Sequence, residues 1–149
     1  MRSPFFGVQR LFPVASLLAL LGSAGCSSRQ FPVHGKVTLE DGTPLTGGLV
    51  IFESRVPEGK IPIMARGAIR ADGSYELSTS KPGDGARPGK YRVIILPPQP
   101  DVDASSKVRS PTFDRRYSDF TTSGLEFEVK AAANDILIQV ARPGKGPRT

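Results

Sequence analysis

Few residues of this sequence have the types and spacing that catalysis requires. The chain holds one histidine, His34, and one cysteine, Cys26. A single cysteine forms no internal disulfide and builds no cysteine metal site. His34 falls on the polar side of an alternating stretch, with no neighbouring partner that would make it a catalytic base, so we expect an ordinary surface residue. The sequence therefore predicts no enzymatic activity and no cofactor.

The polar segment 99–123 carries most of the remaining candidate chemistry. Ca²⁺ needs about six or more oxygen ligands, and the spacing of the carboxylates in this segment matches no closed calcium loop. We therefore expect no metal site from Asp101, Asp103, Asp114 and Asp119. Its cations suit anionic glycan or phosphate groups, although neutralisation of the nearby carboxylates is the favoured interpretation of the charges themselves. The candidate contact residues are Lys107, Arg109, Arg115, Arg116 and Tyr117.

Lys36 and Asn134 are a further pair to consider, because some surface β-sandwiches join a first-strand lysine to a last-strand asparagine by an isopeptide bond. That reaction needs both side chains buried beside a protonated carboxyl group. Alternation directs Lys36 outward, so we expect no such bond.

Residues 1–25 have the layout of an export signal. A basic start precedes the apolar run Leu11–Leu21, and small residues then lead to Cys26. As a helix the apolar run would be about 16 Å long, too short for a hydrocarbon core of about 30 Å. The sequence predicts a removable signal peptide rather than a membrane-spanning helix.

The residues before Cys26 resemble the lipobox of bacterial lipoproteins, with the sequence Ser23-Ala24-Gly25-Cys26. Ser23 stands where that pattern favours leucine, and cleavage by an ordinary signal peptidase is the alternative. The resemblance implies a diacylglycerol on the sulfur and a further acyl chain such as palmitate, which together anchor a protein firmly. Since Ser27 rather than an aspartate follows, we expect a lipid-anchored envelope protein at the outer membrane or cell surface.

Short strands dominate the rest of the chain. Apolar and polar residues alternate with a period of two, and 48–54 reads as a mostly apolar, more central strand. Asp72-Gly73 is the strongest hairpin signal, between the third and fourth strands. No helical period follows the signal peptide. We expect an all-β fold, a seven-stranded antiparallel sandwich.

The length and composition fit one domain. The 149 residues include 16 Gly and 14 Pro, which suits many turns between short strands. The net charge of +6 is interspersed rather than clustered, so we expect no nucleic-acid partner. The expected divisions are a signal peptide at 1–25, a tether at 26–32, the sandwich at 33–141 and a disordered basic tail at 142–149.

Residues 33–140 resemble the carboxypeptidase regulatory-like domain, also called transthyretin-like. The motifs that carry the resemblance are Gly35-Lys36-Val37, Asp41-Gly42-Thr43-Pro44-Leu45, Asp72-Gly73-Ser74-Tyr75-Glu76-Leu77 and Pro88-Gly89-Lys90-Tyr91-Arg92-Val93. The resemblance implies a Greek-key sandwich. In the carboxypeptidases this module is an accessory beside the catalytic domain, so it implies docking or ligand contact rather than chemistry.

We therefore expect a non-enzymatic, lipid-anchored envelope protein that binds a protein or glycan partner through segment 99–123. Its membrane contact would be the lipid on Cys26. One alternative is a structural assembly component that pairs through a sheet edge. A less favoured alternative is an unrecognised hydrolase.

Overall fold

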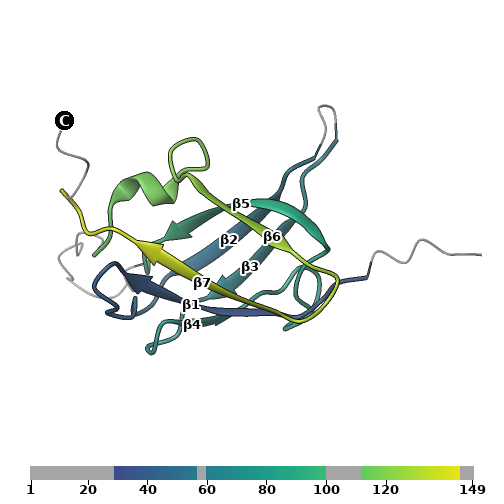
Figure 1. Ribbon diagram of the computed structural model, residues 1–149, viewed down its shortest axis with the longest axis horizontal. Helices are drawn as coiled ribbons and strands as arrows, with labels where there is room; N and C mark the ends of the chain where they lie inside the picture. The colour runs from purple at the N-terminus through teal and green to yellow at the C-terminus, as the bar shows by residue number, and fades with distance from the viewer. Residues whose placement is uncertain (1–28, 57–59, 100–111, 145–149) are drawn as a thin grey trace, which may run out of the picture.

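The computed structural model describes residues 29–56, 60–99 and 112–144 (Figure 1). These residues form an all-β fold with two sheets around one core, a sandwich-like arrangement. The strands are β1 (Val33–Leu39), β2 (Leu49–Ser54), β3 (Met64–Ala68), β4 (Ser74–Glu76), β5 (Gly89–Leu96), β6 (Leu125–Val129) and β7 (Asn134–Val140), with a 3₁₀ helix, η1 (Arg115–Ser118), between β5 and β6. The expected signal peptide and Cys26 lie outside the described residues.

The three-stranded sheet has the order β4-β1-β7. β1 is its central strand, antiparallel to β4 and parallel to β7 from Val33↔Asn134 to Leu39↔Val140. An antiparallel arrangement throughout was expected, and the β1–β7 pair is a departure from it. The parallel pairing is possible because the chain passes through the other sheet before β7 returns along β1.

The four-stranded sheet has the order β3-β2-β5-β6 and is antiparallel throughout. β2 lies inside this sheet, as its nearly continuous apolar sequence predicts. β3 and β6 form its two edges. Figure 1 shows the two sheets as layers, with β1, β4 and β7 on one side and β2, β3 and β5 behind them.

The core follows the predicted alternation. Tyr75 and Leu77 on and after β4, and Tyr91 in β5, are at most 1% exposed. Phe52 lies at the centre, with its ring 6.3 Å from Tyr75, 6.0 Å from Tyr91 and 6.1 Å from Phe127. This aromatic cluster joins strands of both sheets, and such ring pairs contribute beyond their buried area.

The predicted hairpin at Asp72-Gly73 is confirmed in part: the Arg70 N–H donates to the Ser74 carbonyl at 2.8 Å, and Arg66 and Ser78 exchange two backbone hydrogen bonds in an antiparallel bridge. The turn itself is tight, with the Gly73 N–H donating to the Arg70 carbonyl at 2.9 Å and Asp72 accepting from the Ser74 N–H at 3.0 Å. However, β3 pairs with β2 whereas β4 pairs with β1. The chain crosses from one sheet to the other at this turn, because β4 covers an edge of β1.

Candidate contact surface

The second half of the long polar segment folds against the end of the sandwich. Phe113 and Tyr117 are 1% and 6% exposed and belong to the core. Between them, Asp114 caps η1 by accepting a hydrogen bond from the Arg116 N–H at 3.0 Å. Residues 112–123 therefore contain a short 3₁₀ helix that buried aromatic rings fix to the core.

Three hydrogen bonds hold this segment on β5 and on the end of β7. The Ser118 hydroxyl donates to the Ile95 carbonyl at 2.8 Å. The Asp114 N–H donates to the Ala141 carbonyl at 2.9 Å, and the Ala141 N–H donates to the Tyr117 hydroxyl at 3.3 Å. Segment 112–123 is thus fixed to two strands that lie in different sheets.

Two of the predicted contact residues, Arg115 and Arg116, are exposed on η1. The Arg116 guanidinium donates to the Tyr117 hydroxyl at 2.5 Å and lies 4.6 Å from the centre of that ring. This hydrogen bond raises the pKa of Arg116 above its usual value. Tyr117 itself is buried, so the structure makes it a support for Arg116 rather than a contact residue.

A third exposed arginine, Arg142, lies beside the same segment, one residue after Ala141. It donates to Asp41 at 2.7 Å, which ties the end of β7 to the turn after β1. The Arg142 hydrogen bond, together with those from Thr43, holds the pKa of Asp41 well below its usual range. Arg142 belongs to the expected tail 142–149, of which residues 145–149 lie outside the described part.

This surface lies at the end of the sandwich opposite the expected tether. The tether leads into Val33, at the start of β1. Because β7 runs parallel to β1, the end of β7 lies beside Leu39, at the far end of β1. Figure 1 shows η1 and the described C-terminal residues at one end, and the start of β1 at the other.

Several predicted residues fall where the structure gives no description. Lys107 and Arg109 lie in 100–111, with Asp101 and Asp103, and Cys26 lies in 1–28. Of the remaining carboxylates, Asp119 accepts from the Thr121 N–H at 2.7 Å, and its hydrogen bonds with Thr121 lower its pKa. Within residues 29–56, 60–99 and 112–144, no three His, Cys, Asp or Glu side chains gather to hold a metal ion.

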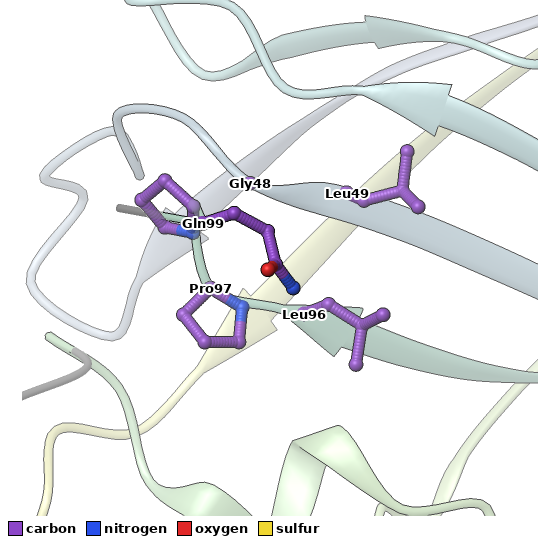
Figure 2. Close-up of a pocket in the computed structure, with 6 residues that line it drawn as sticks. Gly48, Leu49, Leu96, Pro97 and Gln99 are labelled. Atoms are coloured by element: carbon purple, nitrogen blue, oxygen red, sulfur yellow. The ribbon is translucent and has the colours of Figure 1, made fainter. Parts of the chain in front are cut away.

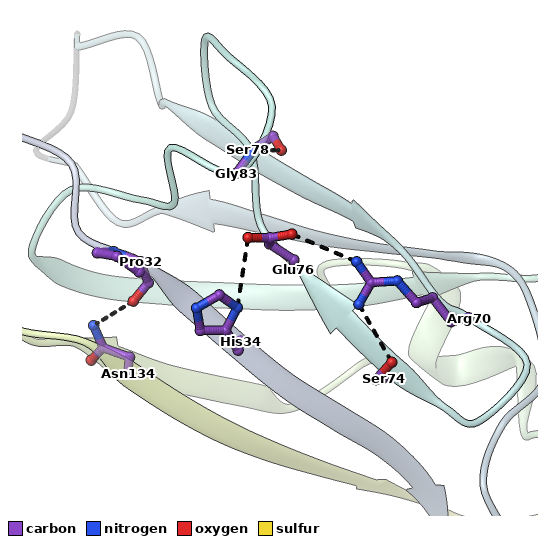
Figure 3. Close-up of polar contacts among 8 residues, drawn as sticks. All are labelled: Pro32, His34, Arg70, Ser74, Glu76, Ser78, Gly83 and Asn134. Atoms are coloured by element: carbon purple, nitrogen blue, oxygen red, sulfur yellow. Dashed lines mark hydrogen bonds and ion pairs between the residues drawn. The ribbon is translucent and has the colours of Figure 1, made fainter.

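His34 is exposed as predicted, but it does have a partner. The register of β1 and β4 places it opposite Glu76, with 3.8 Å between His34 Nδ1 and Glu76 Oε1. Arg70 approaches the other oxygen of Glu76 at 3.6 Å, so Glu76 lies between the two (Figure 3). All three side chains face solvent, where such pairs contribute little stability. The expectation that His34 lacks a neighbour was wrong.

Lys36 points outward, as predicted, and it is not the β1 residue that lies opposite Asn134. Lys36 is exposed, and Asn134 pairs with Val33 in the β1–β7 register. The Asn134 side chain instead bonds the backbone of the β6–β7 turn, accepting from the Lys130 N–H at 2.8 Å and donating to the Ala132 carbonyl at 2.7 Å. Its role is to cap that turn.

A shallow hollow of about 210 Å³ lies where β2 begins and β5 ends (Figure 2). It is lined by Gly48, Leu49, Leu96, Pro97, Pro98 and Gln99. Pockets that enclose small molecules are usually about 300–1,000 Å³. This hollow is smaller than that range.

No family model matches this chain, and no curated protein matches its sequence. The resemblance to the carboxypeptidase regulatory-like domain therefore stays a prediction. In the described part of the chain, the structure has no helix with the length and apolar character needed to cross a bilayer.

Proposed function

We propose that this chain is an exported, lipid-anchored envelope protein that binds an anionic protein or glycan partner through Arg115 and Arg116. One observation carries the proposal. Segment 112–123 is fixed by two buried aromatic rings and presents both arginines at the end of the sandwich farthest from the expected tether. Loops on rigid β-sandwiches commonly carry recognition, and guanidinium groups suit carboxylate, sulfate and phosphate groups.

The proposed anchor is a lipidated Cys26, supported by the order of basic, apolar and small residues that precede it. Residues 26–32 would then connect the lipid to Val33. With the anchor at this end, Arg115 and Arg116 point away from the membrane. A partner in the surrounding envelope would therefore meet these arginines first.

The proposed family is the carboxypeptidase regulatory-like domain, with a Greek-key arrangement of seven strands. The two-sheet, all-β architecture and the parallel pairing of β1 with β7 are compatible with this proposal. Within that family the module accompanies a catalytic domain rather than performing the reaction. We accordingly propose a binding role without catalysis.

The test uses the full-length chain in membranes of the producing cell. Arg115→Ala/Arg116→Ala is compared with Arg66→Ala/Arg70→Ala, a matched control that removes two exposed arginines near β3. Chemical crosslinking followed by mass spectrometry identifies the captured partner. We expect the first variant to capture about tenfold less partner and the control to match wild type. Equal capture by all three proteins would contradict the proposed surface.

A second candidate function is assembly through a sheet edge, and the length of β7 favours it. β7 is an edge strand of seven residues, and long edges with free backbone groups accept strands from other chains. Crosslinks that map to β7 rather than to η1 would favour this candidate over the first.

A further inference from the structure

The outer edge of β7 presents a row of backbone groups. The Asn134 N–H donates to the Pro32 carbonyl at 2.9 Å, and the Glu40 N–H donates to the Val140 carbonyl at 3.1 Å. These bonds direct the backbone of Asn134 and Val140 toward β1. Since successive residues of a strand alternate in direction, the backbone groups that face away from β1 belong to Asp135, Leu137 and Gln139.

Ala141, the next outward-facing residue after Gln139, already has hydrogen-bond partners. Ala141 also faces away from β1, and both of its backbone groups bond to segment 112–123, through Asp114 and Tyr117. Among the described residues, no hydrogen bond reaches the outward backbone groups of Asp135, Leu137 or Gln139. Segment 112–123 therefore covers only the last position of this edge.

The other edges carry features that block pairing, and β7 carries few. β4 has three residues, β3 carries Arg66 and Gly67, and β6 carries Glu126 and Glu128. β7 contains no Lys, Arg, Pro or Gly and one acidic residue, Asp135, and its central Leu137 is 56% exposed. Short length, charge and irregular backbone are the usual protections of an edge, so β7 is the least protected edge in the described structure.

We propose that β7 pairs antiparallel with β7 of a second copy of this chain, with the two-fold axis at Leu137. The proposal deepens the second candidate function, edge pairing, by naming the partner. In this register each Leu137 lies opposite the partner's Leu137, and about six backbone hydrogen bonds join the two strands. The two three-stranded sheets become one continuous sheet.

The side chains favour this register. Ile136 lies opposite the partner's Ile138, so the half-buried Ile136 gains an apolar neighbour on the core side. Asp135 lies opposite the partner's Gln139, so no like charges face each other. The same patch of each copy is used, as a closed two-fold dimer requires.

Neighbouring registers are less favourable. Moving the axis to Ile136 places the exposed Leu137 opposite the partner's Asp135. Moving it to Ile138 places Asp135 opposite the partner's Ala141, whose outward backbone groups already bond to Asp114 and Tyr117. Only the axis at Leu137 places leucine opposite leucine and uses three outward residues that have no partner within the described structure.

Disulfide crosslinking tests the register. The full-length chain, taken in membranes of the producing cell, carries Leu137→Cys, Gln139→Cys or Met64→Cys. Cys26 is left unchanged, because the proposed lipid occupies its sulfur. Hydrogen-bonded antiparallel partners have Cα atoms about 5.5 Å apart, within the range that a disulfide spans. The other two positions are controls. In this register residue 139 lies about 13 Å from residue 139 of the second copy, and Met64 lies on the β3 edge, away from β7. We expect at least about tenfold more disulfide dimer from Leu137→Cys than from either control.

Equilibrium sedimentation of the same full-length protein in detergent gives an independent readout. We expect the wild-type chain to dimerise and Leu137→Lys to weaken dimerisation about tenfold, because two ammonium groups then face each other. Met64→Lys, the same change on another edge, should dimerise like wild type. A monomeric wild-type chain, or equal crosslinking at all three positions, would overturn the proposal. A Leu137→Cys crosslink to a different protein without homodimer would also overturn self-pairing, while leaving edge assembly as the function.

Discussion

At the scale of single residues, Tyr117 links the core to the proposed contact surface. Its ring is buried, while its hydroxyl accepts from the N–H of Ala141, itself 1% exposed, and from the Arg116 guanidinium. One side chain thus completes the hydrogen bonding of a buried strand end and orients an exposed cation. Tyr117 therefore couples stability to the geometry of the surface.

Tyr117→Phe removes the two hydrogen bonds of the hydroxyl group and keeps the packing of the ring. The ring stays, but the buried Ala141 N–H loses its acceptor, which should reduce the free energy of unfolding by about 1–3 kcal/mol. Urea denaturation measures that loss, and partner crosslinking should fall with it. Tyr91→Phe is the control, because it removes a hydrogen bond to the carbonyl of Arg87, which precedes β5 and lies away from η1. It should lower stability without changing partner capture. Wild-type stability in Tyr117→Phe would contradict this role.

Asp84 makes stability depend on pH. Burial raises the pKa of its carboxyl group, but the N–H groups of Thr79, Lys81 and Ser80 donate to it and together lower its pKa from 3.8. A lowered pKa contributes stability above the unfolded value, and that stability is lost as the pH falls through the folded value. We expect unfolding midpoints to fall as the pH drops below about 4.

Asp84→Asn should flatten this acid dependence and lower stability at neutral pH. Glu128→Gln is the control, since Glu128 accepts no hydrogen bond from the described residues and its removal should leave the acid dependence intact. The measurement is the denaturation midpoint at a series of pH values. An Asp84→Asn curve parallel to wild type would show that this carboxylate is not responsible.

At the scale of elements, alternation predicts which residues are buried but not which strands pair. The alternation in 134–140 predicts that Ile136, Ile138 and Val140 face the core. Ile138 and Val140 are buried and Ile136 is half-buried. The same pattern arises whether a neighbouring strand runs parallel or antiparallel, so it carries no information on the parallel β1–β7 pair. For the same reason, the Asp72-Gly73 turn was identified while the division of β3 and β4 between two sheets was not.

The structure shows where two of the candidate contact residues lie. The basic residues Arg115 and Arg116 were identified from their type and are exposed. The anchoring of 112–123 was missed because Phe113 and Tyr117 stand four residues apart in a polar stretch, with no repeating period around them. An isolated pair of aromatic residues in a long loop is the signal that would have indicated it.

The close contact between β1 and β7 gives a prediction for Gly35. A Cβ atom at this position would lie 1.9 Å from the Ile136 carbonyl oxygen and 2.7 Å from the Tyr75 hydroxyl. Gly35→Ala should therefore force the sheet to shift, at a cost of about 2–4 kcal/mol in the free energy of unfolding. Urea denaturation measures the change.

Gly42→Ala is the matched control, because its Cβ would enter open space. Its φ of +82° still makes alanine unfavourable there, by about 1 kcal/mol. Gly35→Ala should be clearly the more damaging of the two. If both variants unfold at the same urea concentration, the close approach of β1 and β7 is wrong.

At the scale of the whole molecule, the proposed functions are separated in space. The expected tether enters at the start of β1, the arginine surface lies at the opposite end, and the free edge of β7 runs between them (Figure 1). A lipid at one end would leave both the end surface and the edge accessible. Anchoring restricts the chains to a surface, which raises their effective concentration and favours weak edge pairing.

The most direct test of this account is the intact mass and membrane partitioning of the full-length gene product, compared with Cys26→Ala. We expect the wild-type chain to begin at Cys26, to carry acyl mass and to partition with membranes. The Cys26→Ala chain should lack the acyl mass and lose that partitioning. A wild-type chain that retains residues 1–25 and stays unacylated in the soluble fraction would contradict it.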